Sequence, residues 1–189
     1  MSKLVCGIGF NSKGEYKTYL SGKRAYTTWY NMIRRCYDPE YHKTRPTYLD
    51  CSVCDEWLDY QGFARWYESK ESNRDNYELD KDLLVPKNKI YSPNTCCFVP
   101  SQLNSLLVDC NSVRGKYPQG VSFDRVANKF QAHINFNGKR KKLGYFDCPK
   151  KAYKTYKSTK ERHVKNEALQ WANDIQWEVF VALMRWELS

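Results

Sequence analysis

The stretch YELDKDLLVPKNKIYSPNTCCFVPSQLN, residues 77–104, decides the fold expected for this chain. Its pattern predicts a short strand ending near Asp80, a loop that carries Asn94, a second strand, and a helix that carries Asn104. The spacings between these three residues are 14 and 10 positions. We therefore expect a strand–loop–strand–helix unit whose separate elements bring oxygen-bearing side chains toward one point.

Oxygen ligands of this kind suit a hard divalent cation such as Mg²⁺ or Mn²⁺. Such a cation can neutralise the charge that develops during phosphodiester hydrolysis, while a base activates water. Asp80 and Asn104 are the candidate metal ligands, and Asn94 could orient the residue at position 81. Asp82 shares the strand face of Asp80 and could hold a water or a second ligand. In the alternative interpretation, Asp80 and Asn94 only form turns.

This stretch resembles the HNH endonucleases of bacteriophages, through Leu-Asp-Lys at a first motif and Tyr-Ser-Pro-Asn-Thr-Cys at a second. The likeness covers roughly residues 3–108 and includes WYNMIRRCYD and CSVCDEWLDYQGFARWY. It implies that Asp80 and Asn104 bind the metal and that Asn94 orients a general base. Lys81 stands where these enzymes carry the base histidine. A lysine with an ordinary pKa of about 10 is a poor base near neutral pH, and we expect it to contact phosphate instead.

Positive charge is concentrated in one segment of the chain. The net charge of the 189 residues is +10, and residues 113–165 alone hold 15 Lys and Arg against 3 Asp and Glu. A cationic segment of this kind attracts a polyanion, and nucleic acid is the expected one. The alternative is a solubilising surface, although solubility alone would tolerate scattered charge.

The same segment holds three stretches of period-two alternation, GVSFDRV, KFQAHINFN and KRKKLGYF, with turn residues such as Asn137-Gly138 between them. They predict a three-stranded antiparallel sheet, and Pro149 predicts the start of a helix packed on it. Alternation assigns Leu143 and Tyr145 to the helix side of the sheet or to its edges. It leaves these side chains as candidates for the opposite, exposed face: Arg125, Lys129, Gln131, His133, Asn135, Arg140 and Lys142.

This segment resembles the plant ethylene-response-factor, or Apetala-two, DNA-binding domain over roughly residues 115–160. The likeness lies in Gly-Val-Ser-Phe, Lys-Phe-Gln-Ala, Asn-Gly-Lys-Arg and Leu-Gly-Tyr-Phe-Asp. It implies that the exposed face of the sheet lies in the major groove of duplex DNA. In that position Gln and Asn can read adenine, Arg can read guanine, and Lys can hold phosphates.

Eight cysteines in a chain without an export signal indicate reduced thiols or metal ligands. Cys51 and Cys54 have the spacing of zinc ligands, and Cys96 and Cys97 could complete a four-sulfur site. Because the usual second pair with this spacing is missing, buried reduced cysteines are the preferred interpretation.

Two further patterns concern the ends of the chain. Glycines and alternating apolar residues predict a hairpin over residues 3–20, with its turn at 11–14. Near the other end, Ile175, Val179, Leu183 and Trp186 fall on one face of an amphipathic helix. This helix either docks on the body of the protein or binds a partner, and docking is the preferred interpretation.

The expected fold is of the α+β class. A ββα-metal, HNH-like nuclease domain is expected over residues 1–112, a three-stranded antiparallel sheet packed on a helix over 113–165, and a C-terminal amphipathic helix over 166–189. The expected function is that of a phage-type homing endonuclease that binds duplex DNA and hydrolyses it with Mg²⁺ or Mn²⁺. A catalytically inactive DNA- or protein-binding module on the same scaffold is the alternative, and RNA binding is a third reading that the aromatic residues permit.

The location expected of the chain follows from its apolar segments. No apolar run reaches membrane-spanning length, and MSKLVCGIGFNSKGEYK has no apolar core typical of a secretory signal. We therefore expect a protein of the (infected) host cytoplasm that is not secreted and has no membrane partner.

Overall fold

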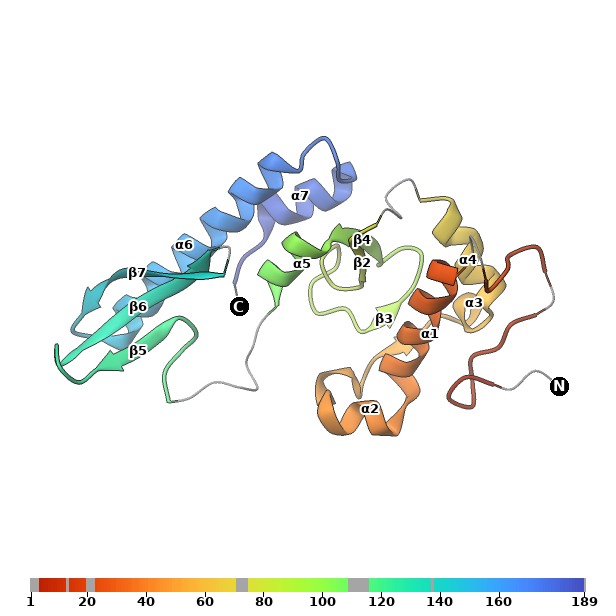
Figure 1. Cartoon of the computed structure of the whole chain (residues 1–189), viewed down its shortest axis with the longest axis horizontal. Helices are drawn as coiled ribbons and strands as arrows, with labels where there is room; N and C mark the ends of the chain where they lie inside the picture. Colours follow the sequence, from red (N-terminus) through yellow and green to blue (C-terminus); the bar gives the residue numbers. More distant parts are fainter. Residues whose placement is uncertain are drawn as a thin grey trace. The chain divides into compact units, whose positions relative to one another are not determined.

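The computed structural model describes residues 4–12, 14–19, 23–70, 75–108, 116–136 and 138–188 (Figure 1). The chain forms two compact units: unit 1 is Met1–Ser101 with Asp174–Val179, and unit 2 is Gln102–Asn173 with Phe180–Ser189. The predicted domain boundary after residue 112 lies outside the described residues. Helices and strands are mixed and one sheet is three-stranded and antiparallel, so the predicted α+β class is confirmed.

Short helices and strands make up unit 1. The helices are α1 (Lys23–Tyr37), α2 (Pro39–Thr44), η2 (Pro46–Tyr48), α3 (Asp55–Leu58) and α4 (Tyr60–Glu68), and the strands are β1 (Ser52–Val53), β2 (Tyr77–Asp80), β3 (Ile90–Tyr91) and β4 (Cys97–Pro100). β1 pairs with β3 in parallel, and β2 pairs with β4 in antiparallel orientation, with Asp80 opposite Cys97. The next helix, α5 (Ser101–Leu107), follows β4 directly, so the predicted order of strand, loop, strand and helix is present.

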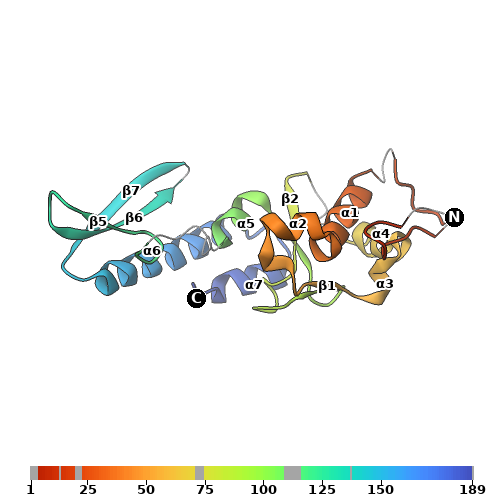
Figure 2. The same cartoon turned by 90° about the horizontal axis from the view of Figure 1, so that it is seen from below.

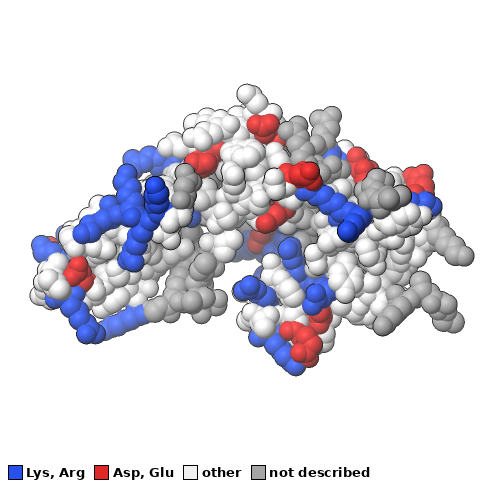
Figure 3. Space-filling view, viewed as in Figure 1, with Lys and Arg blue, Asp and Glu red and all other residues white. Residues whose placement is uncertain are grey.

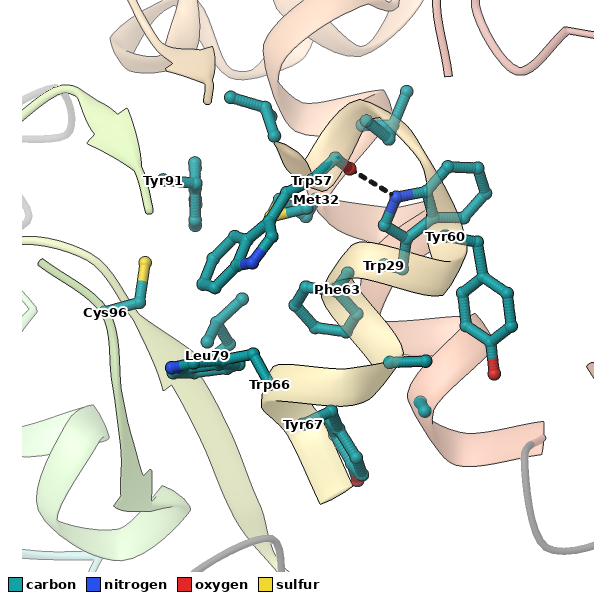
Figure 4. Packing of buried hydrophobic residues seen from close by; sticks show 14 of the residues in the cluster. Trp29, Met32, Trp57, Tyr60, Phe63, Trp66, Tyr67, Leu79, Tyr91 and Cys96 are labelled. Atoms are coloured by element: carbon teal, nitrogen blue, oxygen red, sulfur yellow. Dashed lines mark hydrogen bonds between the residues drawn. The ribbon is translucent and has the colours of Figure 1, made fainter. Parts of the chain in front are cut away.

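Aromatic side chains from α1, α3 and α4 fill the core of unit 1 (Figure 4). Trp29, Trp57, Tyr60 and Phe63 are fully buried. The indole N–H of Trp29 donates to the carbonyl oxygen of Trp57 at 2.7 Å, and the rings of Trp57 and Phe63 meet edge to face at 5.1 Å. Leu79 of β2 reaches the same cluster. The core therefore holds β2, and with it the start of the Asp80 loop, against the helices.

The hairpin predicted for residues 3–20 is wrong. Within the described part of this segment, Val5 bridges Gly9, and Phe10 bridges Asp59 instead of a neighbouring strand. Gln61, at the start of α4, donates to the backbone carbonyl of Tyr16 at 3.0 Å and accepts from its N–H at 3.1 Å. Polar side chains of α4 thus take the backbone partners that a second strand would have supplied.

Unit 2 contains β5 (Val121–Asp124), β6 (Lys129–Phe136), β7 (Lys139–Phe146) and α6 (Pro149–Gln170). The strands form an antiparallel sheet in sequence order, and α6 covers one of its faces (Figure 2). Val121, Ala132 and Ile134 of the sheet and Ala152 and Tyr156 of α6 are buried in the interface clusters. The predicted sheet packed on a helix is therefore confirmed.

The C-terminal part of the chain contains the end of α6 and a last, shorter helix. α6 continues to Gln170, because Val164 and Ala168 extend its buried stripe. The last helix, α7 (Trp177–Arg185), is divided between the two units. Beyond it, the backbone N–H of Leu188 donates to Glu161 Oε1 at 3.1 Å, and Lys157 Nζ donates to the Leu188 carbonyl oxygen at 2.5 Å.

The apolar face predicted for the last helix is buried at three of its four positions, and the fourth, Trp186, is partly buried. Ile175, Val179 and Leu183 are each at most 8% exposed. This burial supports docking of the helix on the protein over binding of a separate partner.

Among the described glycines of unit 2, Gly120 should be the most sensitive to an added methyl group. Its φ is +72°, and a Cβ atom there would lie 2.1 Å from the buried Tyr156 ring. Gly138→Ala is the matched control, because Gly138 has a φ of +75° and open space around it. We expect urea denaturation to show a loss of about 3 kcal/mol for Gly120→Ala and about 1 kcal/mol for Gly138→Ala. Equal losses would contradict the predicted clash.

Candidate functional site

Asp80 closes the turn that follows β2. Its Oδ1 atom accepts hydrogen bonds from the backbone N–H groups of Asp82, at 2.9 Å, and Leu83, at 2.7 Å. Leu83 is buried, so the turn is anchored in unit 1. In the part of the chain that the structure describes, the second oxygen of Asp80, Oδ2, has no hydrogen-bond partner. One carboxylate oxygen therefore builds the turn, as the alternative interpretation expected, and the other is available to a ligand.

The negative charge of Asp80 is incompletely balanced. Burial raises the pKa of its carboxyl group, and the nearby carboxylate of Asp82 raises it further. The two backbone N–H donors and the Lys81 ammonium group act in the opposite direction without reversing the shift. A divalent cation bound to Asp80 would offset both unfavourable contributions, because it supplies positive charge where burial has removed water.

The raised pKa predicts how stability without metal depends on pH. The Asp80 carboxyl keeps its proton to a higher pH in the folded chain than in the unfolded chain, where its pKa is about 3.9. Its contribution to the free energy of unfolding therefore falls as the pH rises from about 4 through the raised pKa. Asp80→Asn, which keeps the Oδ1 acceptor, should gain stability relative to the wild type over that range. Urea denaturation in EDTA measures this difference, and a difference independent of pH would contradict the assignment.

Lys81 points into unit 1, and only 10% of its side chain is exposed. Its Nζ atom donates to Asp82 Oδ2 at 2.9 Å. Burial lowers the pKa of the ammonium group, but the hydrogen bond to Asp82 and the nearby negative charges raise it by more. Lys81 is therefore protonated near neutral pH, which makes it unsuitable as a general base. In this structure it orients the Asp82 carboxylate, and the contact with phosphate that the sequence predicted remains a prediction.

Asn88 holds the loop between β2 and β3, and sequence reasoning missed it. Its side-chain amide donates to the carbonyl oxygens of Lys81, at 2.7 Å, and Ile90, at 2.6 Å. Thr95 Oγ1 also donates to the Ile90 carbonyl, at 2.8 Å. The available signal was the asparagine in Pro-Lys-Asn-Lys, because asparagine side chains often bond to backbone groups in turns.

Two further residues were predicted for this site, Asn94 as the orienting residue and Asn104 as the second metal ligand. Asn94 is exposed in the turn before β4, and no hydrogen bond joins its side chain to another described residue. The contact to position 81 comes from Asn88 instead. Asn104 lies on α5 in unit 2, whereas Asp80 belongs to unit 1. The roles of Asn94 as orienting residue and of Asn104 as second metal ligand therefore stay predictions.

The four cysteines considered for zinc lie in or near the interior of unit 1. Cys51, Cys96 and Cys97 are buried and Cys54 is partly buried, all without disulfides. Burial raises the pKa of Cys51, and it raises that of Cys96 to about 12, so both sulfurs are protonated near neutral pH. Among the described residues, no group of three or more His, Cys, Asp or Glu side chains is arranged to hold a metal ion.

The face of the β5–β7 sheet opposite α6 carries most of the predicted DNA contacts; we call it the outer face. Three cross-strand pairs lie on it, and they are Gln131 opposite Tyr145, His133 opposite Lys142, and Asn135 opposite Arg140. Arg125 is exposed in the turn between β5 and β6. In this turn the backbone N–H groups of Val126 and Ala127 donate to Asp124 Oδ1. Lys129 is the first residue of β6, and its Nζ atom lies 3.4 Å from Asp147 Oδ1. Cations and amides therefore form a row along neighbouring strands.

Tyr145 lies on this outer face, which corrects its expected place on the helix side of the sheet or at its edges. A β-bulge near Ala132 and His133 shifts the register, and Gly144 opposite Ala132 has a φ of +149°. The chain thus turns Tyr145 to the face of Gln131, although Leu143 still packs toward α6. The glycine in Leu-Gly-Tyr was the available signal, because a glycine inside a strand often marks a bulge.

A hydrogen-bond network fixes several outer-face side chains. The Tyr145 hydroxyl donates to Asp124 Oδ2 at 2.8 Å and accepts from Lys142 Nζ at 3.1 Å and Gln131 Nε2 at 3.3 Å. Burial, aided by Arg140, lowers the pKa of His133, so its ring is neutral near neutral pH. The outer face thus carries cations beside neutral hydrogen-bond donors and acceptors, and the network orients Lys142 and Gln131 among them.

The positive charge counted in residues 113–165 is visible on the surface of unit 2. Lys and Arg side chains gather on unit 2 around β7 and α6 in Figure 3, with few acidic side chains among them.

Comparison with protein-family models, with characterised proteins and with solved structures found no match to this chain. None of the described helices is long and apolar enough to cross a membrane.

Proposed function

We propose that this protein binds duplex DNA through the outer face of the β5–β7 sheet and hydrolyses phosphodiester bonds at the Asp80 loop with Mg²⁺ or Mn²⁺. This is the activity of a phage-type HNH homing endonuclease, as the sequence resemblance implies. The observation that carries the proposal is the row of cations and amides on the outer face. Two acidic side chains pair with this row among the described residues, Asp124 through the Tyr145 hydroxyl and Asp147 beside Lys129.

The geometry of the outer face suits a DNA groove. The major groove admits a β-ribbon, and side chains on one face of such a ribbon reach base edges. Arg140 can donate two hydrogen bonds to guanine, while Gln131 and Asn135 can each bond adenine in a bidentate manner. Lys142 and Lys129 suit phosphate contacts, which set position rather than sequence.

The Asp80 loop supports the hydrolytic part of the proposal. A divalent cation would supply charge neutralisation and an activated water. Asp80 would bind it through Oδ2, because Oδ1 is committed to the turn. Lys81 would keep the Asp82 carboxylate oriented beside the ion. Since Lys81 is protonated, the proton of the attacking water must pass to another group.

A second candidate function is DNA binding without cleavage. The specific observation in its favour is the state of Lys81, which is enclosed, protonated and paired with Asp82 at the position where related enzymes carry their base. On this view the Asp80 turn serves as a scaffold, and the protein acts by occupying DNA.

Two assays on the full chain separate these functions. Fluorescence anisotropy with labelled duplex DNA in EDTA measures binding without cleavage. Conversion of supercoiled plasmid to open-circular or linear DNA in Mg²⁺ or Mn²⁺ measures hydrolysis. Salt-dependent binding with metal-dependent nicking supports the nuclease, and binding without nicking in either metal supports the second candidate. Absence of duplex binding at low salt would refute both.

A further inference from the structure

A pocket lies on the helix side of the unit 2 sheet, lined by residues of β6, β7 and α6. Its volume is about 350 Å³, within the range of small-ligand sites. We call it the α6 pocket. The strands and the helix contribute these lining residues: Phe136, Lys141, Leu143, Thr155, Thr159, Arg162, His163 and Asn166.

The cations of the α6 pocket have no acidic partner. Arg162 and Asn166 are exposed and make no hydrogen bond or ion pair with another described residue. Lys141 only approaches the Phe136 ring, with its Nζ 5.9 Å from the ring centroid. The acidic side chain that pairs with His163 is Glu167, whose Oε1 lies 3.7 Å from His163 Nδ1, and Glu167 is not part of the lining. An anion could therefore be held by two cations at once.

The remaining walls suit a flat, polar ring. Phe136 and Leu143 provide an apolar surface, and the Phe136 ring already makes an edge-to-face contact with His163 at 4.4 Å. The hydroxyl groups of Thr155 and Thr159, which line the pocket, donate to backbone carbonyls of α6, so their oxygens remain able to accept a hydrogen bond. Asn166 adds an amide that both donates and accepts.

We propose that the α6 pocket binds a nucleotide. Its phosphate would lie between Arg162 and Lys141, and its base would contact Phe136, with polar edges toward Asn166 and the threonine oxygens. This site is separate from the outer face, because the lining strand residues lie on the α6 side of the sheet. The inference does not rest on the proposed function. The same chemistry is offered by a free mononucleotide and by one nucleotide of a single strand.

Isothermal titration calorimetry on the full chain tests this inference, with dTMP, thymidine, inorganic phosphate and the single strand (dT)₆ as probes. We expect dTMP to bind at least ten times more tightly than thymidine or phosphate. The double variant Lys141→Ala/Arg162→Ala should weaken dTMP binding at least tenfold, and the variant Lys150→Ala/Lys154→Ala, which removes the same charge from exposed positions of α6 outside the pocket lining, should not. Phe136→Leu should weaken dTMP binding and leave phosphate binding unchanged.

The possible results of these titrations either identify the ligand of the α6 pocket or overturn the inference. Tighter pocket-dependent binding of (dT)₆ than of dTMP identifies a strand as the ligand, and the reverse identifies a free nucleotide. Equal affinity for phosphate and dTMP would overturn the inference, as would equal losses in the two double variants. Circular dichroism of each variant confirms that it is folded, and the exposure of Lys141 and Arg162 makes loss of folding unexpected.

Discussion

Asp80→Asn should abolish metal-dependent cleavage of plasmid DNA while leaving duplex affinity in EDTA within about twofold of the wild type. The substitution keeps the Oδ1 acceptor that holds the turn at Asp82 and Leu83 but removes the negative charge. Loss of a group that merely orients a metal ligand costs 10–100-fold in activity or metal affinity, so loss of the ligand itself should lower the cleavage rate at least about 100-fold. Gel assays of nicking over time measure this effect.

Asp50→Asn is the control for this substitution. Asp50 is an exposed carboxylate in the same unit and has no hydrogen bond or ion pair with the described residues, so its loss changes charge equally without touching the loop. A second readout is the shift of the unfolding temperature on addition of Mn²⁺, which should be present in the wild type and in Asp50→Asn and absent in Asp80→Asn. Unchanged nicking by Asp80→Asn would remove the proposed metal site.

Removal of the two outer-face cations Arg140 and Lys142 should lower affinity for duplex DNA by roughly 100-fold in about 0.1 M salt. Each lost charged contact costs about 1.5 kcal/mol, and the two contacts lie on separate cross-strand pairs. The slope of log affinity against log salt should also fall by about 0.9 for each phosphate contact removed. Anisotropy titrations of Arg140→Ala/Lys142→Ala at several salt concentrations measure both quantities.

The control is Lys150→Ala/Lys154→Ala, which removes the same charge from exposed positions on α6. Because α6 covers the opposite face of the sheet, we expect this variant to lose less than about fivefold in affinity through the weaker overall field. Equal losses in both double variants would show that the net charge of unit 2, and not the arrangement of the outer face, accounts for binding.

Local periodicity was sufficient to predict the sheet of unit 2 and its helix. Alternation in KFQAHINFN and a proline at the start of α6 act within a few residues, and nothing distant in the chain opposes them. The same reasoning failed at residues 3–20, where Gln61, more than forty positions away, bonds to the backbone of Tyr16. Periodicity describes which face of an element is apolar, but it does not show which distant side chain will form hydrogen bonds with the backbone N–H and C=O groups of that element.

At the candidate site, too, the sequence predicted some features and only the packed structure decided others. The sequence by itself determined the order of strand, loop, strand and helix around Asp80, and it placed the amides and cations of unit 2 on alternate positions of neighbouring strands. Only the tertiary structure decided that Lys81 is buried against Asp82, that Asn88 holds the loop, and that a bulge turns Tyr145 to the outer face. These outcomes depend on solvent exclusion and on register between strands, which are properties of packed elements and not of neighbours in sequence.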